Sequence, residues 1–246
     1  MDRLLYVAMS GARESFHGQA AVNNNLANAN TPGFLADLQH FRSMPVFGAG
    51  YPTRVYALSE RPDTDFAPGT IQSTGRDLDV AVQGEGWIAV QGSDGGEVYT
   101  RRGDLQIDPN GRLLTGDNLP VMGNSGPIAL PPAEKVDIGS DGTISIRPPG
   151  VEPNELVIVD RIKLVKPPPG SLQKGNDGLM RLKDGSTAEA DPKLGLLSGA
   201  LVTSNVNGVH EMVDMIELSR RFELQVRMMK AAEESGAASA SLLRPV

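Results

Sequence analysis

Residues 1–34 read MDRLLYVAMSGARESFHGQAAVNNNLANANTPGF, and this stretch decides how the chain is interpreted. Its small and apolar residues recur in alternating steps of three and four, which is the heptad spacing of a helix with one packing seam. Most members of the seam are small or polar, so the helix alone would bury little apolar surface. The pattern therefore predicts a helix that needs a partner. The seam positions are Leu5, Ala8, Ala12, Ser15, Gln19, Val22, Leu26 and Ala29.

The C-terminal region repeats the same alternation and is the obvious partner. Its seam positions are Met212, Met215, Ser219, Phe222, Val226, Met229 and Glu233. Val209, Val213, Ile216 and Leu218 widen the apolar face. Two heptad helices thus bracket a middle of different character, which predicts paired termini carrying a β-rich head. Periodicity leaves open the alternative that both helices pack onto one globular core.

Composition narrows the classes of protein that remain. Among the 246 residues, 39% are hydrophobic and 4% aromatic, with 28 Gly and 18 Pro, which favours turns and short strands over long buried elements. The net charge of −7 argues against nucleic-acid binding and against capture by anionic membrane. Cysteine is absent, which excludes disulfides, thiolate metal sites and a cysteine nucleophile. No stretch has the pattern of a secretory signal or the length of a membrane span.

The order of turns and strands predicts an α+β chain in four parts. The first helix, with Asp2 as its N-cap, should run until Asn30-Thr31-Pro32-Gly33, and residues 34–41 then form a short helix or an extended arm. Short alternating runs separated by Gly turns, with a hairpin signal at Asn110-Gly111, predict an all-β barrel or sandwich-like head. The N-cap of the last helix falls at Asn205 or Asn207. The parts are 1–36 (helix), 37–76 (extended linker), 77–194 (β-rich head) and 195–246 (helix).

Three local patterns resemble chemical sites, but each lacks a part that the chemistry needs. Gly84-Glu85-Gly86-Trp87-Ile88-Ala89 matches a dinucleotide motif, but another strand follows where a helix N-terminus would be needed. Residues 137–142 suggest a calcium loop, yet Pro148 stands where the bidentate Glu belongs. His17, His40 and His210 lie far apart and have no recognisable motif around them. The sequence therefore predicts no catalytic, cofactor-binding or metal-ligating residue.

The asparagines at the end of the first helix form the strongest local signal. Residues 23–31 read NNNLANANT, although Asn is a mediocre helix former and costly to bury. Packed between helices, amides such as those of Asn25 and Asn28 would fix register and partner choice at some cost in stability. The alternative is that these residues mark only a fraying helix end.

Both ends of the chain resemble the bacterial flagellar rod and hook family. Residues 24–34, NNLANANTPGF, are similar to the N-terminal signature of that family. Ser204-Asn205-Val206-Asn207, followed by EMVDMI at 211–216 and Arg221-Phe222-Glu223, is similar to its C-terminal signature. The opening residues 1–12 and the stretches DLDVAVQGEGW (77–87) and YTRRGDL (99–105) resemble most the proximal-rod branch.

The resemblance implies a non-enzymatic axial subunit without cofactors. Such a subunit would leave the cytoplasm through the flagellar type III export apparatus, without a cleaved signal peptide, and polymerise in the periplasm-spanning rod of the basal body. Its partners would be copies of itself and related proximal and distal rod proteins, with no nucleic acid and no direct membrane insertion. Its terminal helices would form a coiled-coil-like inner tube. The expected assembly-interface residues are Leu5, Ala8, Ala12, Val22, Asn25, Leu26, Asn28, Ala29, Met212, Met215, Ile216, Phe222, Val226 and Met229.

Other interpretations remain open at this point. A distal rod or hook-type protein would share the terminal signatures. A secreted β-barrel enzyme with dimerising helices would need two carboxylates held apart in a cleft, which the many Asp and Glu residues do not exclude. A coiled-coil adhesin or scaffold is the third alternative.

Overall fold

The computed structural model describes residues 4–45, 55–59, 63–149, 156–168 and 170–242. The chain divides into two compact units. One, the helical unit, comprises residues 1–29, 36–65 and 206–246, and the other, the head unit, comprises residues 30–35 and 66–205. The architecture is therefore α+β, as predicted, with helices from both termini and a β-rich middle.

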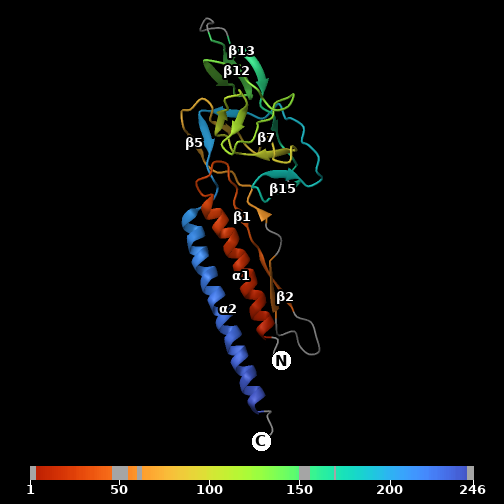
Figure 1. Ribbon diagram of the computed structural model, residues 1–246, viewed down its shortest axis with the longest axis vertical. Helices are drawn as coiled ribbons and strands as arrows, with labels where there is room; N and C mark the ends of the chain where they lie inside the picture. Colours follow the sequence, from red (N-terminus) through yellow and green to blue (C-terminus); the bar gives the residue numbers. More distant parts are fainter. Residues whose placement is uncertain (1–3, 46–54, 60–62, 150–155, 169, 243–246) are drawn as a thin grey trace. The chain divides into compact units, whose positions relative to one another are not determined.

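The helical unit is built on α1 (Leu4–Ala27) and α2 (Gly208–Leu242), which lie side by side and antiparallel (Figure 1). Helix α2 begins where the sequence predicted, because the Asn207 side-chain oxygen accepts hydrogen bonds from the backbone N–H of Val209 at 3.1 Å and of His210 at 3.3 Å. Helix α1 ends at Ala27, a few residues before the predicted boundary. The predicted N-cap Asp2 lies outside the described residues.

Small residues allow the two helices to approach closely. A Cβ added at Gly18 would lie 3.2 Å from the side chain of Leu218, and Gln19 Nε2 donates to Ser219 Oγ at 3.1 Å. The seam residues Ala8 and Ala12 are buried. The α1 seam thus packs mainly through small side chains, so the contact between α1 and α2 buries little apolar surface.

A two-stranded ribbon follows α1 in the chain and packs against it. It consists of β1 (Asp37–Leu38), β2 (Phe41–Pro45), β3 (Val55–Ser59) and β4 (Asp63–Thr64), with β1 paired to β4 and β2 to β3, both antiparallel. Gln39 Nε2 donates to the backbone carbonyl of His17 at 3.0 Å, which ties the ribbon to the helix. Much of residues 37–76, expected as an extended linker, thus forms paired strands.

The strands of the head unit are short and form several small sheets. The strands are β5 (Ile71–Ser73), β6 (Val80–Val82), β7 (Trp87–Gln91), β8 (Glu97–Thr100), β9 (Leu105–Ile107), β10 (Leu113–Thr115), β11 (Lys135–Ile138), β12 (Thr143–Arg147), β13 (Val157–Arg161), β14 (Leu164–Val165), β15 (Leu172–Lys174), β16 (Met180–Leu182), β17 (Leu196–Ser198) and β18 (Ala200–Val202). The largest sheet has the order β14-β7-β8-β16-β15, and a second has the order β11-β12-β13. The other described strands of the head pair in twos, β9 with β10, β6 with β17 and β5 with β18, so the described residues form no closed barrel.

Turn chemistry explains the hairpins that the sequence predicted. Strands β9 and β10 pair antiparallel around Asn110 and Gly111, where Gly111 takes a φ of 80° that other residues rarely adopt. The residues after Gly84-Glu85-Gly86 form strand β7, so the dinucleotide-like stretch is a turn between strands. Residues 196–202, expected only as a connection, form β17 and β18, which pair with β6 and β5.

The head unit contains two main clusters of buried apolar side chains. The larger one gathers the inward-facing residues of β6, β7, β9, β10 and β12 with the segments between them. The second cluster lies on the other face of β7 and β8. Its members are Leu35, Trp87, Ala89, Tyr99, Val165, Leu172 and Met180. Leu35 reaches this cluster from the short segment 30–35 that follows α1.

Candidate assembly site

Helix α2 exposes a large apolar surface that its partner helix does not cover. Ile216 is 54% exposed and Val209 is 74% exposed, although both belong to the predicted apolar face. Large apolar residues also face solvent on α1. The exposed apolar residues of the two helices are Leu5, Tyr6, Met9, Phe16, Val209, Met212, Val213, Ile216, Phe222, Leu224 and Met228. A surface of this kind on a helix pair marks a site of association.

The structure divides the predicted interface residues into three groups. Ala8, Ala12 and Asn25 are buried within the helical unit. Half-buried residues are Val22, Leu26, Asn28, Ala29, Met215, Val226 and Met229. Leu5, Met212, Ile216 and Phe222 are exposed. Ile216 lies off the heptad seam of α2, and the seam positions themselves range from half-buried (Met215, Val226, Met229) to exposed (Met212, Phe222).

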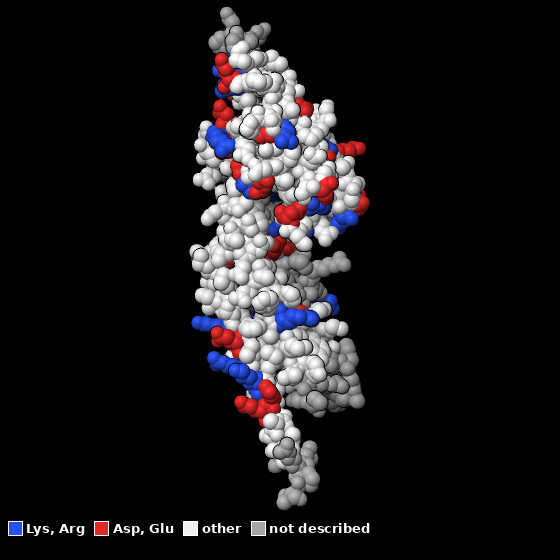
Figure 2. Space-filling view, in the orientation of Figure 1, with Lys and Arg blue, Asp and Glu red and all other residues white. Residues whose placement is uncertain are grey.

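The sequence patterns did not predict the exposed apolar side chains of the ribbon β2–β3. On the ribbon β2–β3, the side chains of Phe41, Met44, Val55 and Leu58 are exposed. The pattern of residues 37–76 predicted an extended linker and did not indicate that these apolar side chains would stay uncovered. On the face shown in Figure 2, the described charged residues of both signs are scattered over the head and along the end of α2. That distribution does not form the basic stripe that nucleic-acid binding needs.

One buried amide connects three segments of the helical unit. Asn25 is 2% exposed, and its side-chain oxygen accepts from the backbone N–H of Asp37 at 2.8 Å. Its Nδ2 donates to the carbonyl of Asp37 at 3.0 Å and to Glu211 Oε1 at 3.1 Å. The side chain thus fixes β1 and α2 against α1. Asn28 bonds instead to its own helix, because its Nδ2 donates to the carbonyl of Asn24 at 3.0 Å.

Glu211 makes the stability of this contact depend on pH. Burial raises the pKa of the Glu211 carboxyl above its ordinary value, while the hydrogen bond from Asn25 opposes the shift. A raised pKa in the folded state means that the folded chain binds more protons than the unfolded one. The stability that Glu211 contributes is therefore fully present below its unfolded pKa, about 4.3, and is lost as pH rises through the raised value.

We expect Glu211→Gln to remove this pH dependence from the helical unit. The amide cannot ionise and still offers an oxygen to Asn25. Thermal unfolding followed by circular dichroism, at several pH values between about 4 and 7, would measure the difference between variant and wild type. The other carboxylates cancel in that comparison. A difference that stays constant with pH would contradict the assignment to Glu211.

The segment 30–35 is locked into the head unit by backbone contacts. Gly33 N–H donates to the carbonyl of Val202 at 2.8 Å, and Asn205 N–H donates to that of Phe34 at 3.3 Å. Lys174 Nζ lies 4.0 Å from the centroid of the Phe34 ring and donates to the carbonyl of Leu35 at 2.7 Å. Phe34 and Asn205, one from each of the two stretches that carry the family resemblance, therefore meet in the head unit.

Gly33 is required by this packing. Its φ is 69°, and an added Cβ would lie 2.4 Å from the backbone carbon of Arg101. We expect Gly33→Ala to destabilise the head unit by about 2 kcal/mol, from the unfavourable φ and the backbone clash together. The matched control is Gly84→Ala, because Gly84 has a φ of 74° but open space around its Cα. Urea unfolding of both variants would test this, and equal losses would contradict the clash.

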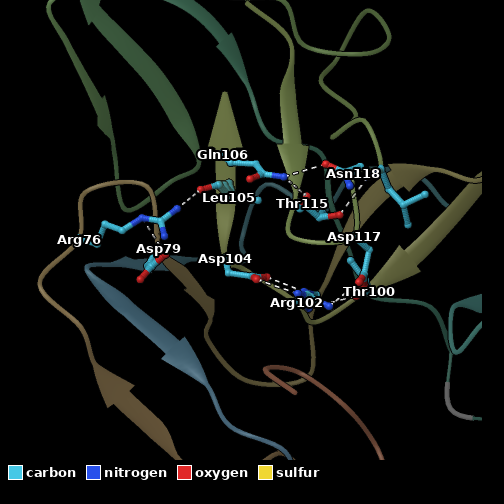
Figure 3. Close-up of polar contacts among 11 residues, drawn as sticks. Arg76, Asp79, Thr100, Arg102, Asp104, Leu105, Gln106, Thr115, Asp117 and Asn118 are labelled. Carbon is cyan, nitrogen blue, oxygen red and sulfur yellow. Dashed lines mark hydrogen bonds and ion pairs between the residues drawn. The ribbon is translucent and has the colours of Figure 1, made fainter. Parts of the chain in front are cut away.

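A polar network around Arg102 fixes loops of the head unit (Figure 3). Arg102 donates to Asp104 at 2.7 and 2.9 Å and to Asp117 at 2.5 Å. The hydrogen bond to Asp104 is the main cause that raises the pKa of Arg102. Gln106 Nε2 donates to Asn118 Oδ1 at 2.9 Å, which ties β9 to the turn after β10. These contacts brace the YTRRGDL stretch without forming a reactive centre.

The described residues contain no cluster of three or more His, Asp or Glu side chains that could hold a metal ion. Tyr99 is fully buried, accepts from the backbone N–H of Ala188 at 2.6 Å, and burial raises its pKa to about 12, so it is a structural phenol. None of the described helices is long and apolar enough to cross a membrane.

Comparison with known proteins assigns the class. Residues 5–34 match the family described as flagella basal body rod protein, and residues 197–242 match the flagellar basal body rod FlgEFG protein C-terminal family. Residues 81–146 match the flagellar hook protein FlgE/F/G D1 domain. The protein is thus a structural subunit of the flagellar basal-body rod, not an enzyme.

Relatives that match nearly the whole chain show which members of this family are most similar to it. The chain is 43% identical to flagellar basal-body rod protein FlgF of Escherichia coli and 42% identical to FlgF of Salmonella typhimurium, with 99% of each chain covered. It is 31% identical to flagellar basal-body rod protein FlgG of Bacillus subtilis, with 95% of this chain and 96% of the FlgG chain covered. The chain belongs to the flagellar rod and hook family, and FlgF proteins are among its most similar relatives.

Proposed function

We propose that this protein is a proximal-rod subunit that polymerises through its terminal helices. The observation that carries the proposal is the exposed apolar face of α2 formed by Val209, Met212, Val213 and Ile216. In the assembled rod this face would pack against helices of neighbouring subunits to form a coiled-coil-like inner tube. The β-rich head would then make the outer layer.

The size of the exposed surface is consistent with tight assembly. Burying one large apolar side chain completely contributes about 1.5–3 kcal/mol, and residues such as these start roughly half exposed. The exposed apolar side chains on α1 and α2 together would contribute on the order of 10 kcal/mol per subunit. Association costs about 4–15 kcal/mol. The polymer is therefore favoured when each subunit buries this surface against more than one neighbour.

The partners would be copies of this chain and related axial proteins, including other proximal-rod subunits and the distal rod protein. The protein would reach the rod through the flagellar type III export apparatus and would lie where the rod spans the periplasm. A thin α1–α2 seam and the absence of cysteine support passage as an unfolded chain. The similarity to FlgG keeps a distal-rod role as the second candidate.

Deletion of the gene in its host tests the proposal. We expect non-motile cells whose basal bodies stop before the distal rod, and recovery when the gene is restored. Mass spectrometry should find the protein in basal bodies purified from complemented cells. Basal bodies that lack only the distal rod portion would favour the second candidate, and complete flagella in the deletion strain would contradict both.

A further inference from the structure

The two helices of the helical unit carry separate apolar patches. One patch, called the α2 face, lies on one side of the first turns of α2, and its residues are exposed at helical spacing. The other, called the α1 stripe, lies on one side of the first half of α1. The members of the α2 face are Val209, Met212, Val213 and Ile216, and those of the α1 stripe are Leu5, Met9 and Phe16.

Each patch is limited to one part of its helix. Further along the side of α2 that carries the α2 face, the exposed residues are Arg220, Glu223 and Arg227, which are charged. Beyond the α1 stripe, the same side of α1 continues with Ala20 and Asn23, which are exposed and offer little apolar surface. An apolar partner therefore fits α2 only along residues 209–216 and α1 only along residues 5–16.

The packing of the two helices places these patches at different heights. The helices run antiparallel (Figure 1). A Cβ added at Gly18 would lie 3.2 Å from Leu218, and one added at Gly11 would lie 2.8 Å from Gln225. In this register the α2 face lies beside the last turns of α1, whereas the α1 stripe lies beside the second half of α2. The centres of the two patches are about 13 residues apart along the helix axis, which at 1.5 Å per residue is about 20 Å.

Two unlike patches on one subunit allow an open chain of contacts. If the α2 faces of two copies met around a two-fold axis, the pair would close and both α1 stripes would stay uncovered. If the α1 stripe of one copy met the α2 face of the next, a free stripe and a free face would remain at the two ends. Only the second arrangement covers both patches and continues from subunit to subunit, as a rod requires.

We propose that the α2 face of each subunit receives the α1 stripe of a second copy of this chain, shifted by about 20 Å along the helix axis. This contact repeats between copies the antiparallel packing of α1 on α2 within the subunit. The long side chains of the α1 stripe enter the grooves between the β-branched side chains of the α2 face. The inference rests on the proposed assembly into a rod and names the partner of the α2 face.

Cross-linking between two single-cysteine subunits tests the shift. Full-length Met9→Cys and Met212→Cys subunits, each with its own tag, would be expressed together in a strain that lacks the gene, since the natural chain has no cysteine. A short bifunctional maleimide applied to purified basal bodies should join the two tagged chains. The matched control pairs Met9→Cys with Arg227→Cys, because Arg227 is exposed and level with Met9 in the register of the two helices. We expect at least about tenfold more mixed dimer from the first pair, because yield follows the effective concentration of the thiols.

A second pair tests the direction of the contact and replaces the first if its variants do not enter rods. Antiparallel packing brings Phe16 of one copy to Val209 of the next, so Phe16→Cys with Val209→Cys should cross-link more than Phe16→Cys with Ile216→Cys. Dimers of Met212→Cys with itself would show that two α2 faces meet and would overturn the proposal. An excess of dimer in the Arg227 pair, or no mixed dimer from subunits that are present in rods, would also overturn it. Absence of the wild-type subunit from basal bodies would instead contradict the proposed function.

Discussion

Replacing Ile216 with aspartate is expected to abolish rod assembly and motility while leaving the head unit folded. Ile216 is exposed in the subunit and belongs to the apolar face of α2. In the isolated chain the new carboxylate would be hydrated and nearly harmless. In the polymer it would be buried without a partner, at a cost of several kcal/mol for each subunit.

The measurement is recovery of rods and swimming, alongside circular dichroism of the purified variant. Ser235→Asp is the matched control, because Ser235 is exposed on the same helix outside this apolar face. We expect the control to assemble, the Ile216 variant to be missing from basal bodies, and both to have the same β signal. Normal swimming with Ile216→Asp would refute the proposed role of this face.

Replacing Asn25 with leucine is expected to destabilise the helical unit by about 3 kcal/mol or more, because it leaves buried polar groups without partners. The variant removes the acceptor for the Asp37 N–H and the donor for the Asp37 carbonyl. It also removes the amide that donates to the half-buried Glu211. Packing of a similar volume cannot replace these bonds, so β1 and α2 should lose their fixed positions against α1.

Hydrogen exchange of the full-length subunit would measure this effect. Protection is expected to fall along α1 and α2 in Asn25→Leu and to stay unchanged in the head unit. Asn23→Leu is the control from the same cluster, since Asn23 is exposed, and its effect should stay within about 0.5 kcal/mol of zero. Equal protection in the two variants would show that the Asn25 amide does not hold the helical unit together.

Local sequence patterns predicted where the helices and the hairpin lie, but not which of their side chains are buried. Heptad spacing located both helices, and the Asn110-Gly111 turn located the β9–β10 hairpin, because each signal lies within a few residues. The same spacing could not show that Leu218 is buried against α1 while Ile216 faces solvent. That difference depends on how closely α1 approaches at Gly18, which is a property of the packed pair.

Long-range contacts escaped prediction for the same reason. Pairing of β17 with β6 joins residues more than a hundred positions apart, and the short run at 196–198 has no local sign of it. Leu35 gave no indication that it would enter the second cluster of the head unit. The predicted barrel does not form in the described residues, because the head strands pair in separate small sheets. The sequence of the Asn cluster does not distinguish Asn25, which contacts β1 and α2, from Asn28, which lies just past α1 and donates to the carbonyl of Asn24.

Cysteine labelling in intact rods tests most directly whether the terminal helices form the assembly surface. The natural chain has no cysteine, so Ile216→Cys or Met212→Cys provides a single reactive thiol on α2. A maleimide should label either variant quickly in the isolated subunit, where both positions are exposed. In purified basal bodies we expect labelling to fall at least about tenfold and to return when the rods are dissociated. Equally fast labelling in intact rods would show that this face stays open to solvent and would contradict assembly through the helices.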